Sequence, residues 1–416
     1  MHNLRLAILY VLILTVPLAA AARDALEVSP QEKKILGQAK DLAQTREVET
    51  AAAFLQAQAA TSRSAPLLFQ LALWQAASEA TRPQAIERLQ QALELAPAFP
   101  GAYRNLGILQ SQTGDYEAAA ASLQKAAQDG WDADVLLALG HVYLKLDNDV
   151  AAESALRQCL VIRPRASAIH AALAQSLMAQ QRFAEARAAA NQAVRLEDRP
   201  APALWQLLAS AAIAEKNYAA AIDALEAAAV IHPDDGQMLW LLADVYQLAG
   251  FRHQAAMAYR QAAAAAPDPE RSRQVLAAMV EEEAPEALAF AKDTVTAAPA
   301  SAPALLLAAR AHYQAGQRSQ AIALARTALQ RQPGDGASAL YLARWLIEDG
   351  AVDEGERLLW TAAATPEAAA EALRALLTLA FDRKHYAAAL KLVDRLAVIE
   401  SQTDWSPFRN RLRNLQ

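Results

Sequence analysis

YRNLGILQSQTGDYEAAAASLQKA, residues 103–126, holds a pattern that returns about every 34 residues along the chain. Leu106 and Gly107 lie in a first stretch with helical spacing, Gly114 marks a turn, and a second helical stretch carries Ala119 and Leu123. A helix-turn-helix unit of this length is typical of an α-solenoid, in which each unit contacts only its neighbours. The pattern therefore predicts an all-α chain.

Small residues recur at the places where two helices of one unit must approach closely. They follow a leucine in the first helix of successive units, at Gly107, Gly140, Ala174, Ala209 and Ala243. A larger side chain there would push the two helices apart. Glycines recur between the two helices, where a left-handed backbone is expected to end the first helix, at Gly114, Gly250, Gly316 and Gly350.

Taken together, these units resemble the tetratricopeptide repeat (TPR) family, whose pattern combines a large residue, Leu-Gly or Leu-Ala, an aromatic residue, small alanines and a closing proline. The resemblance implies a right-handed α-α superhelix, and counting the units gives about eleven helix pairs and a C-terminal capping helix. The expected divisions are a signal peptide (1–22), a degenerate helix pair (23–64), the solenoid (65–401) and the cap (402–416).

The N-terminus reads as a secretory signal peptide. Arg5 precedes an apolar run from Leu6 to Leu14, and Ala20 to Ala22 supply small residues for cleavage after Ala22. We therefore expect a periplasmic protein. The alternative is an uncleaved segment that anchors the chain in the inner membrane, facing the periplasm, but the run is short for a span of about 20 residues.

Composition limits the partners. The net charge of −6, from 39 basic and 45 acidic residues, argues against nucleic acid or anionic lipid as the main partner. A membrane contact is expected only through a partner or an uncleaved anchor. The single cysteine, Cys159, falls where the repeat needs a small packed residue, so we expect it in the core.

No motif for catalysis or for a cofactor stands out. The seven histidines are scattered without ligand spacing, and neither a phosphate-binding loop nor a Gly-x-Ser-x-Gly elbow is present. We therefore predict no catalytic residue, metal or cofactor, and no enzyme activity. The rival hypothesis is a carbohydrate-active or lytic enzyme, which would need an added catalytic domain or a cleft with paired carboxylates.

Candidate binding residues follow from the resemblance, because in TPR relatives the first helix of each unit lines a concave groove. Applied unit by unit, this rule selects a mixed polar and aromatic set: Trp74, Arg104, His141, Gln175, Gln206, Trp240, Asp244, Gln247, Arg310, Tyr313, Arg344, Arg374 and Phe381. Trp74, Trp240 and Tyr313 are the candidate anchors. For each of these aromatic residues, packing between repeats is the alternative.

The leading functional hypothesis is a periplasmic TPR scaffold that binds protein segments of a cell-envelope complex in its groove. The layout is similar to that of TPR proteins that accompany TonB-ExbB-ExbD energy-transduction systems. Alternatives are a scaffold for exopolysaccharide export or synthesis, a factor for cytochrome c assembly, and a peptidoglycan-associated binding protein.

Overall fold

The computed structural model describes residues 28–45, 48–128, 130, 132–297 and 301–415. Within these ranges the chain forms 23 α-helices and no strand. The expected signal peptide, residues 1–22, lies outside the described residues. None of the described helices has the length and apolar character needed to cross a membrane.

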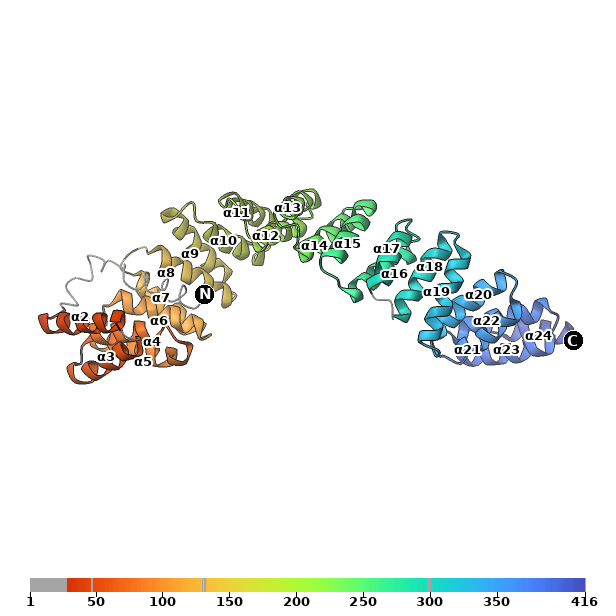
Figure 1. The fold of residues 1–416 in the computed structure, drawn as a ribbon, viewed down its shortest axis with the longest axis horizontal. Helices are drawn as coiled ribbons and strands as arrows, with labels where there is room; N and C mark the ends of the chain where they lie inside the picture. The colour runs from red at the N-terminus through yellow and green to blue at the C-terminus, as the bar shows by residue number, and fades with distance from the viewer. Residues whose placement is uncertain (1–27, 46–47, 129, 131, 298–300, 416) are drawn as a thin grey trace. The chain divides into compact units, whose positions relative to one another are not determined.

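Two compact units divide the chain, one ending at Ala227 and the other beginning at Ala228. Unit 1 is built from consecutive helix pairs (Figure 1). Its helices are α2 (Pro30–Thr45), α3 (Val48–Ser62), α4 (Ala65–Gln75), α5 (Arg82–Leu95), α6 (Pro100–Gln112), α7 (Tyr116–Ala127), α8 (Ala133–Lys145), α9 (Asp149–Ile162), α10 (Ser167–Ala179), α11 (Phe183–Arg195) and α12 (Pro202–Ala214), with the short 3-10 helix η2 (Glu79–Thr81) before α5. Helix α13 (Tyr218–Ile231) crosses the division.

Unit 2 continues the same order of paired helices. Its members are α14 (Gly236–Leu248), α15 (Arg252–Ala265), α16 (Pro269–Glu281), α17 (Ala287–Ala297), α18 (Ala302–Gln314), α19 (Arg318–Arg331), α20 (Gly336–Glu348), α21 (Val352–Ala362), α22 (Ala369–Asp382), α23 (Tyr386–Ile399) and α24 (Ser406–Leu415). The described chain thus contains eleven helix pairs, α2 to α23, and a final single helix. This confirms the number predicted from the repeats.

The turns between paired helices use the predicted left-handed backbone. Gly114, Gly250, Gly316 and Gly350 have φ values of 86°, 83°, 75° and 88°. Helix pairs without glycine at this place have another residue in the same conformation. Lys216, for example, has a φ of 62°. Each helix pair therefore needs a left-handed residue at its turn, and a glycine there only removes the steric cost of that conformation.

Close approach inside a pair depends on the small first-helix residue. A Cβ at Gly107 would lie 2.6 Å from Cγ of Leu123, and Leu123 on α7 is fully buried. Cys159 on α9 is also fully buried, and its Sγ donates to the carbonyl oxygen of Ala133, 3.1 Å away. The prediction that this cysteine belongs to the core is confirmed.

Helix α24 covers the last helix pair. Leu412 is fully buried in a cluster with residues of α22 and α23, and Phe408 packs with its ring centre 6.4 Å from that of Phe381. A terminal repeat would otherwise expose its apolar side to water. The structure therefore places an amphipathic helix where the sequence predicted a cap.

Candidate binding surface

In unit 1 the first helices of successive pairs lie closer together than the second helices do. Helix α6 packs against α8, α8 against α10, and α10 against α12, whereas α7, α9 and α11 approach one another less closely. Elements that converge lie on the inner side of a curved stack, and repeat proteins use that concave side for binding. The first helices of unit 1 therefore present its candidate binding surface.

Three polar side chains predicted from the sequence are exposed on this surface. His141 lies on α8, Gln175 on α10 and Gln206 on α12. Within the part of the chain that the structure describes, none of the three side chains makes a hydrogen bond or an ion pair. Their donors and acceptors are directed to solvent, where a ligand can reach them.

Other half-buried and exposed residues lie on the same helix faces as these three side chains and complete the surface. Positions i, i+4 and i+7 share a helix face. On α8, α10 and α12 they are Leu137, His141, Leu144, Ala171, Gln175, Met178, Gln206, Ser210 and Ile213, which we call the α8–α12 face. Leu137, Ala171, Ser210 and Ile213 were missed from the sequence, although the same spacing applied to every unit would have found them.

His141 stays uncharged more readily than an ordinary histidine. The residue is exposed, yet the surrounding protein removes enough water to lower its pKa below 6.5, and the positive charge of Lys145 lowers it further. A neutral imidazole offers one donor and one acceptor nitrogen. The α8–α12 face therefore contains no acidic or basic side chain that is charged at neutral pH.

The other two predicted residues of unit 1 are already engaged. The guanidinium of Arg104 on α6 pairs with Asp132 at 3.3 Å. Trp74 on α4 is half-buried and packs against the core of the first helix pairs, which includes Leu55 and Leu71. Neither side chain is as accessible as those of the α8–α12 face.

Trp240 in unit 2 is not a groove residue, and that prediction is wrong. Its side chain is only 2% exposed, and its Nε1 donates to the carbonyl oxygen of Ala266 at 3.2 Å. The guanidinium of Arg271, from the next helix pair, lies 4.6 Å from the ring centre. Packing between repeats, the alternative for this residue, is what the structure shows.

Predicted charged residues of unit 2 form ion pairs with residues of neighbouring helix pairs or, for Arg374, of its own pair. Asp244 accepts from Arg271 at 2.5 Å and from the Tyr259 hydroxyl at 2.8 Å. The three arginines each meet a carboxylate: Arg310 meets Glu281 at 2.7 Å, Arg344 meets Glu371 at 2.9 Å, and Arg374 meets Glu400 at 2.7 Å. These pairs neutralise the charges that a ligand would otherwise meet.

Two predicted aromatic residues of unit 2 pack against their own neighbours. Tyr313 stacks on Trp345 with ring centres 4.7 Å apart, and its hydroxyl donates to Glu348. Phe381 contacts the Tyr386 ring at 5.9 Å. Gln247 is exposed, but it stands among these engaged groups as the single free polar side chain of the predicted set in unit 2.

No group of three His, Cys, Asp or Glu residues in the described part of the chain is arranged to hold a metal ion. The polar groups of the α8–α12 face are amides, one hydroxyl and one imidazole, mixed with aliphatic carbon. Such a surface can hydrogen-bond to a peptide backbone and bury small apolar side chains.

Comparison with known proteins identifies the repeats. One tetratricopeptide repeat model matches residues 82–135, 171–236 and 306–359, and a second matches residues 133–165. No curated protein sequence matches the chain.

Solved structures with a similar fold include a MamA protein, at 20% identity over 40% of this chain and 91% of that chain, with a TM-score of 0.38. A tetratricopeptide repeat protein from Parabacteroides merdae is 14% identical over 68% of this chain and 98% of that chain, with a TM-score of 0.41. At these scores the similarities assign no function. From the repeat models and the observed helix pairs, the chain is an all-α solenoid of tetratricopeptide repeats.

Proposed function

We propose that this protein is a non-enzymatic scaffold that binds an extended, uncharged segment of a partner protein on the α8–α12 face. The observation that carries the proposal is the row of exposed side chains without intramolecular partners, His141, Gln175 and Gln206, on three successive first helices. Amide side chains can donate to and accept from a peptide backbone at the same time.

The apolar members of the face indicate the composition of the bound segment. Leu144, Met178 and Ile213 are half-buried, so each still offers carbon surface to a ligand. Methionine adapts to side chains of different shape. A segment with small or medium aliphatic side chains and no net charge fits this surface best, because it loses no ionic hydration on binding.

The cellular setting of the proposal comes from the sequence of residues 1–22. We place the protein in the periplasm, with a component of a cell-envelope complex as the partner, and a TonB-type energy-transduction system as the first candidate. Fractionation of cells that express the full chain, with N-terminal sequencing of the recovered protein, tests this setting. Recovery in the cytoplasm with residue 1 intact would contradict it.

Site-specific photocrosslinking tests the face itself. A benzophenone side chain is placed at Gln175 on α10, and in a matched protein at Gln192, an exposed glutamine on the second helix α11 of the same pair. We expect a discrete crosslinked partner in cells from position 175 and none from position 192. Equal products from both positions would remove the assignment.

Binding to the purified partner then measures the polar contacts. Replacing His141, Gln175 and Gln206 together by Ala should weaken binding by about tenfold or more, since each net hydrogen bond contributes about 0.5–1.5 kcal/mol. Gln192→Ala should leave the affinity unchanged. An unchanged affinity for the triple variant, with its helix content intact, would show that another surface binds.

A further inference from the structure

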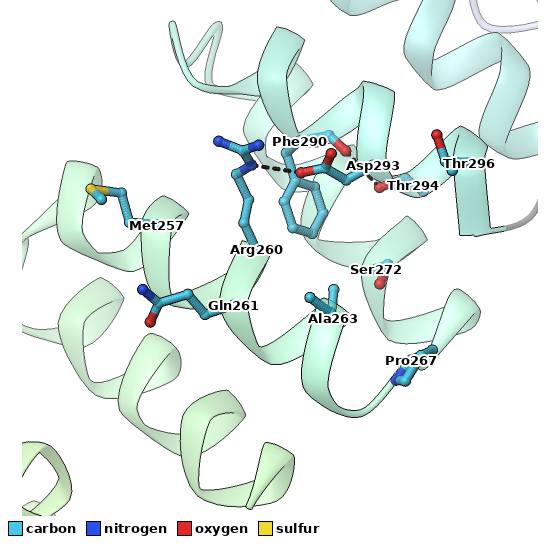
Figure 2. Close-up of a pocket in the computed structure, with 11 residues that line it drawn as sticks. Met257, Arg260, Gln261, Ala263, Pro267, Ser272, Phe290, Asp293, Thr294 and Thr296 are labelled. Carbon is cyan, nitrogen blue, oxygen red and sulfur yellow. Dashed lines mark hydrogen bonds and ion pairs between the residues drawn. The ribbon is translucent and has the colours of Figure 1, made fainter. Parts of the chain in front are cut away.

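Unit 2 contains a cleft between α15, α16 and α17 (Figure 2). Its volume is about 650 Å³. Met257, Ala263, Ala264 and Pro267 supply apolar walls, and Phe290, which is fully shielded from solvent, stands behind them. The volume falls within the range of about 300–1,000 Å³ that is usual for ligand sites.

The cleft results from an irregular repeat. Helix α17 has 11 residues where α15 has 14, and α16 packs more closely on α18 than on α15. The α15 helix contacts α17 directly, which is unusual for second helices in this chain. Helix α16 therefore does not fill the space beside α15 as a regular first helix would.

One hydroxyl in the cleft makes no hydrogen bond. Ser272 on α16 is 2% exposed and lines the cleft, and its Oγ has no partner among the described residues. Thr294 is equally buried, but its hydroxyl donates to the carbonyl oxygen of Phe290 at 2.9 Å. The Ser272 hydroxyl lines the cleft and is not one of the side-chain atoms that are wholly enclosed without a partner, so a ligand atom in the cleft can reach it.

The charges of the cleft cancel. Its two ionic side chains, Arg260 and Asp293, pair with each other at 2.6 Å and stand at the opening, 48% and 39% exposed (Figure 2). A charged occupant would break this pair or meet a like charge. The cleft is therefore complementary to an uncharged group.

We infer that this cleft binds a tyrosine side chain of a partner protein. The ring would lie between the Ala263, Ala264 and Met257 side chains, and its hydroxyl would pair with that of Ser272. Tyrosine combines a large apolar body with one polar tip, which is the combination that these walls and this hydroxyl recognise. The site is separate from the α8–α12 face, so the scaffold holds a second segment there.

Methionine methyl NMR on the full chain tests the inference. The chain has five methionines, so labelled methyl groups are few, and Met257 reports on the cleft while Met178 reports on the α8–α12 face. The probe is the neutral peptide acetyl-Ala-Tyr-Ala-amide, with the Phe peptide as its match. We expect Met257 to shift, Met178 to stay, and the Tyr peptide to bind about fivefold more tightly than the Phe peptide, the effect of one net hydrogen bond.

Variants separate the parts of the site. Ser272→Ala should abolish the preference for Tyr over Phe. Ala264→Trp should block both peptides, whereas Ala265→Trp, at an exposed neighbour outside the cleft, should bind like the unchanged protein. An unmoved Met257 signal, or equal affinities for the two peptides, would overturn the inference.

A final titration, with p-cresol in place of the peptide, distinguishes a small phenol from a tyrosine side chain as the ligand. If p-cresol shifts Met257 and the Tyr peptide does not, the cleft takes a small phenol and the protein-partner inference is overturned. A failure of the α8–α12 face would appear instead in the crosslinking from Gln175, so the two proposals fail separately.

Discussion

At the scale of the residue, Gly140 shows how little room separates paired helices. A Cβ added there would lie 2.6 Å from Cγ and Cδ2 of Leu156, a side chain that is fully buried and cannot move away. We expect Gly140→Ala to destabilise the α8–α9 pair by about 1–3 kcal/mol. Amide hydrogen exchange of α8 and α9 measures the loss.

The matched control is Gly37, also inside a helix, α2, where a Cβ would meet no atom within 4 Å. Gly37→Ala should stabilise its helix by up to about 1 kcal/mol, because alanine has the higher helix propensity. Both substitutions replace glycine by alanine. If one destabilises its helix and the other stabilises it, the difference is due to the steric clash at Gly140. A gain of protection in Gly140→Ala would contradict the packing argument.

His141 should respond to pH in one direction. Its pKa lies below 6.5 in the folded chain because the surrounding protein partly removes water from the exposed ring and because Lys145 is positively charged, so the unfolded chain takes up its proton first as the pH falls. Protonation therefore destabilises the fold as the pH falls from 6.5 through the lowered pKa. The effect fades as the pH rises above 6.5.

Titration of the His141 ring by NMR checks the direction of this shift. Lys145→Ala should raise the pKa of His141 but leave it below 6.5, since partial loss of water around the ring is the larger cause and is unchanged. If His141 titrated above 6.5, its surroundings would favour the charged ring, and the face would no longer count as uncharged.

Single residues also mark where the sequence was insufficient. Repeat spacing placed His141, Gln175 and Gln206 on exposed positions of first helices, but the same spacing put Trp240 in the groove. Trp240 is covered by Arg271, which is 31 residues further along the chain. A rule that considers one unit at a time cannot include a side chain from the next unit.

At the scale of the element, α24 tests what a terminal helix contributes. Leu412 is fully buried against α22 and α23, so Leu412→Ala should cost about 2–5 kcal/mol locally. Amide exchange should rise in α22 to α24. Arg413→Ala, at an exposed position of the same helix, should have little effect. Equal exchange in the two variants would mean that α24 does not stabilise the pair beneath it.

The sequence predicted elements better than it predicted the contacts between them. The pairing of helices follows from the spacing within each repeat, because small residues and turns recur at fixed positions. The ion pairs of Arg310 and Arg344 join neighbouring helix pairs, so no spacing within one pair contains them. The cleft beside Ser272 likewise depends on the meeting of three helices.

At the scale of the whole molecule, cohesion comes from contacts between neighbours. The apolar cluster around Leu123 and Leu139, for example, joins helices of successive pairs in unit 1. In such arrays stability is approximately a sum of repeat terms and nearest-neighbour terms. A single free energy of unfolding is then poorly defined for the whole chain.

Leu123→Ala puts this cohesion to the test. Leu123 is fully buried, so its loss should cost about 2–5 kcal/mol in its own neighbourhood. Exchange should rise in α6 to α9 and stay unchanged in α20 to α23, because energetic effects fade along a chain of nearest-neighbour contacts. Val150→Ala, which removes carbon from a side chain that is 71% exposed on α9, should change neither region. A uniform rise across both units after Leu123→Ala would show instead that the chain unfolds as one cooperative body, and binding at the α8–α12 face would then be energetically coupled to the cleft in unit 2.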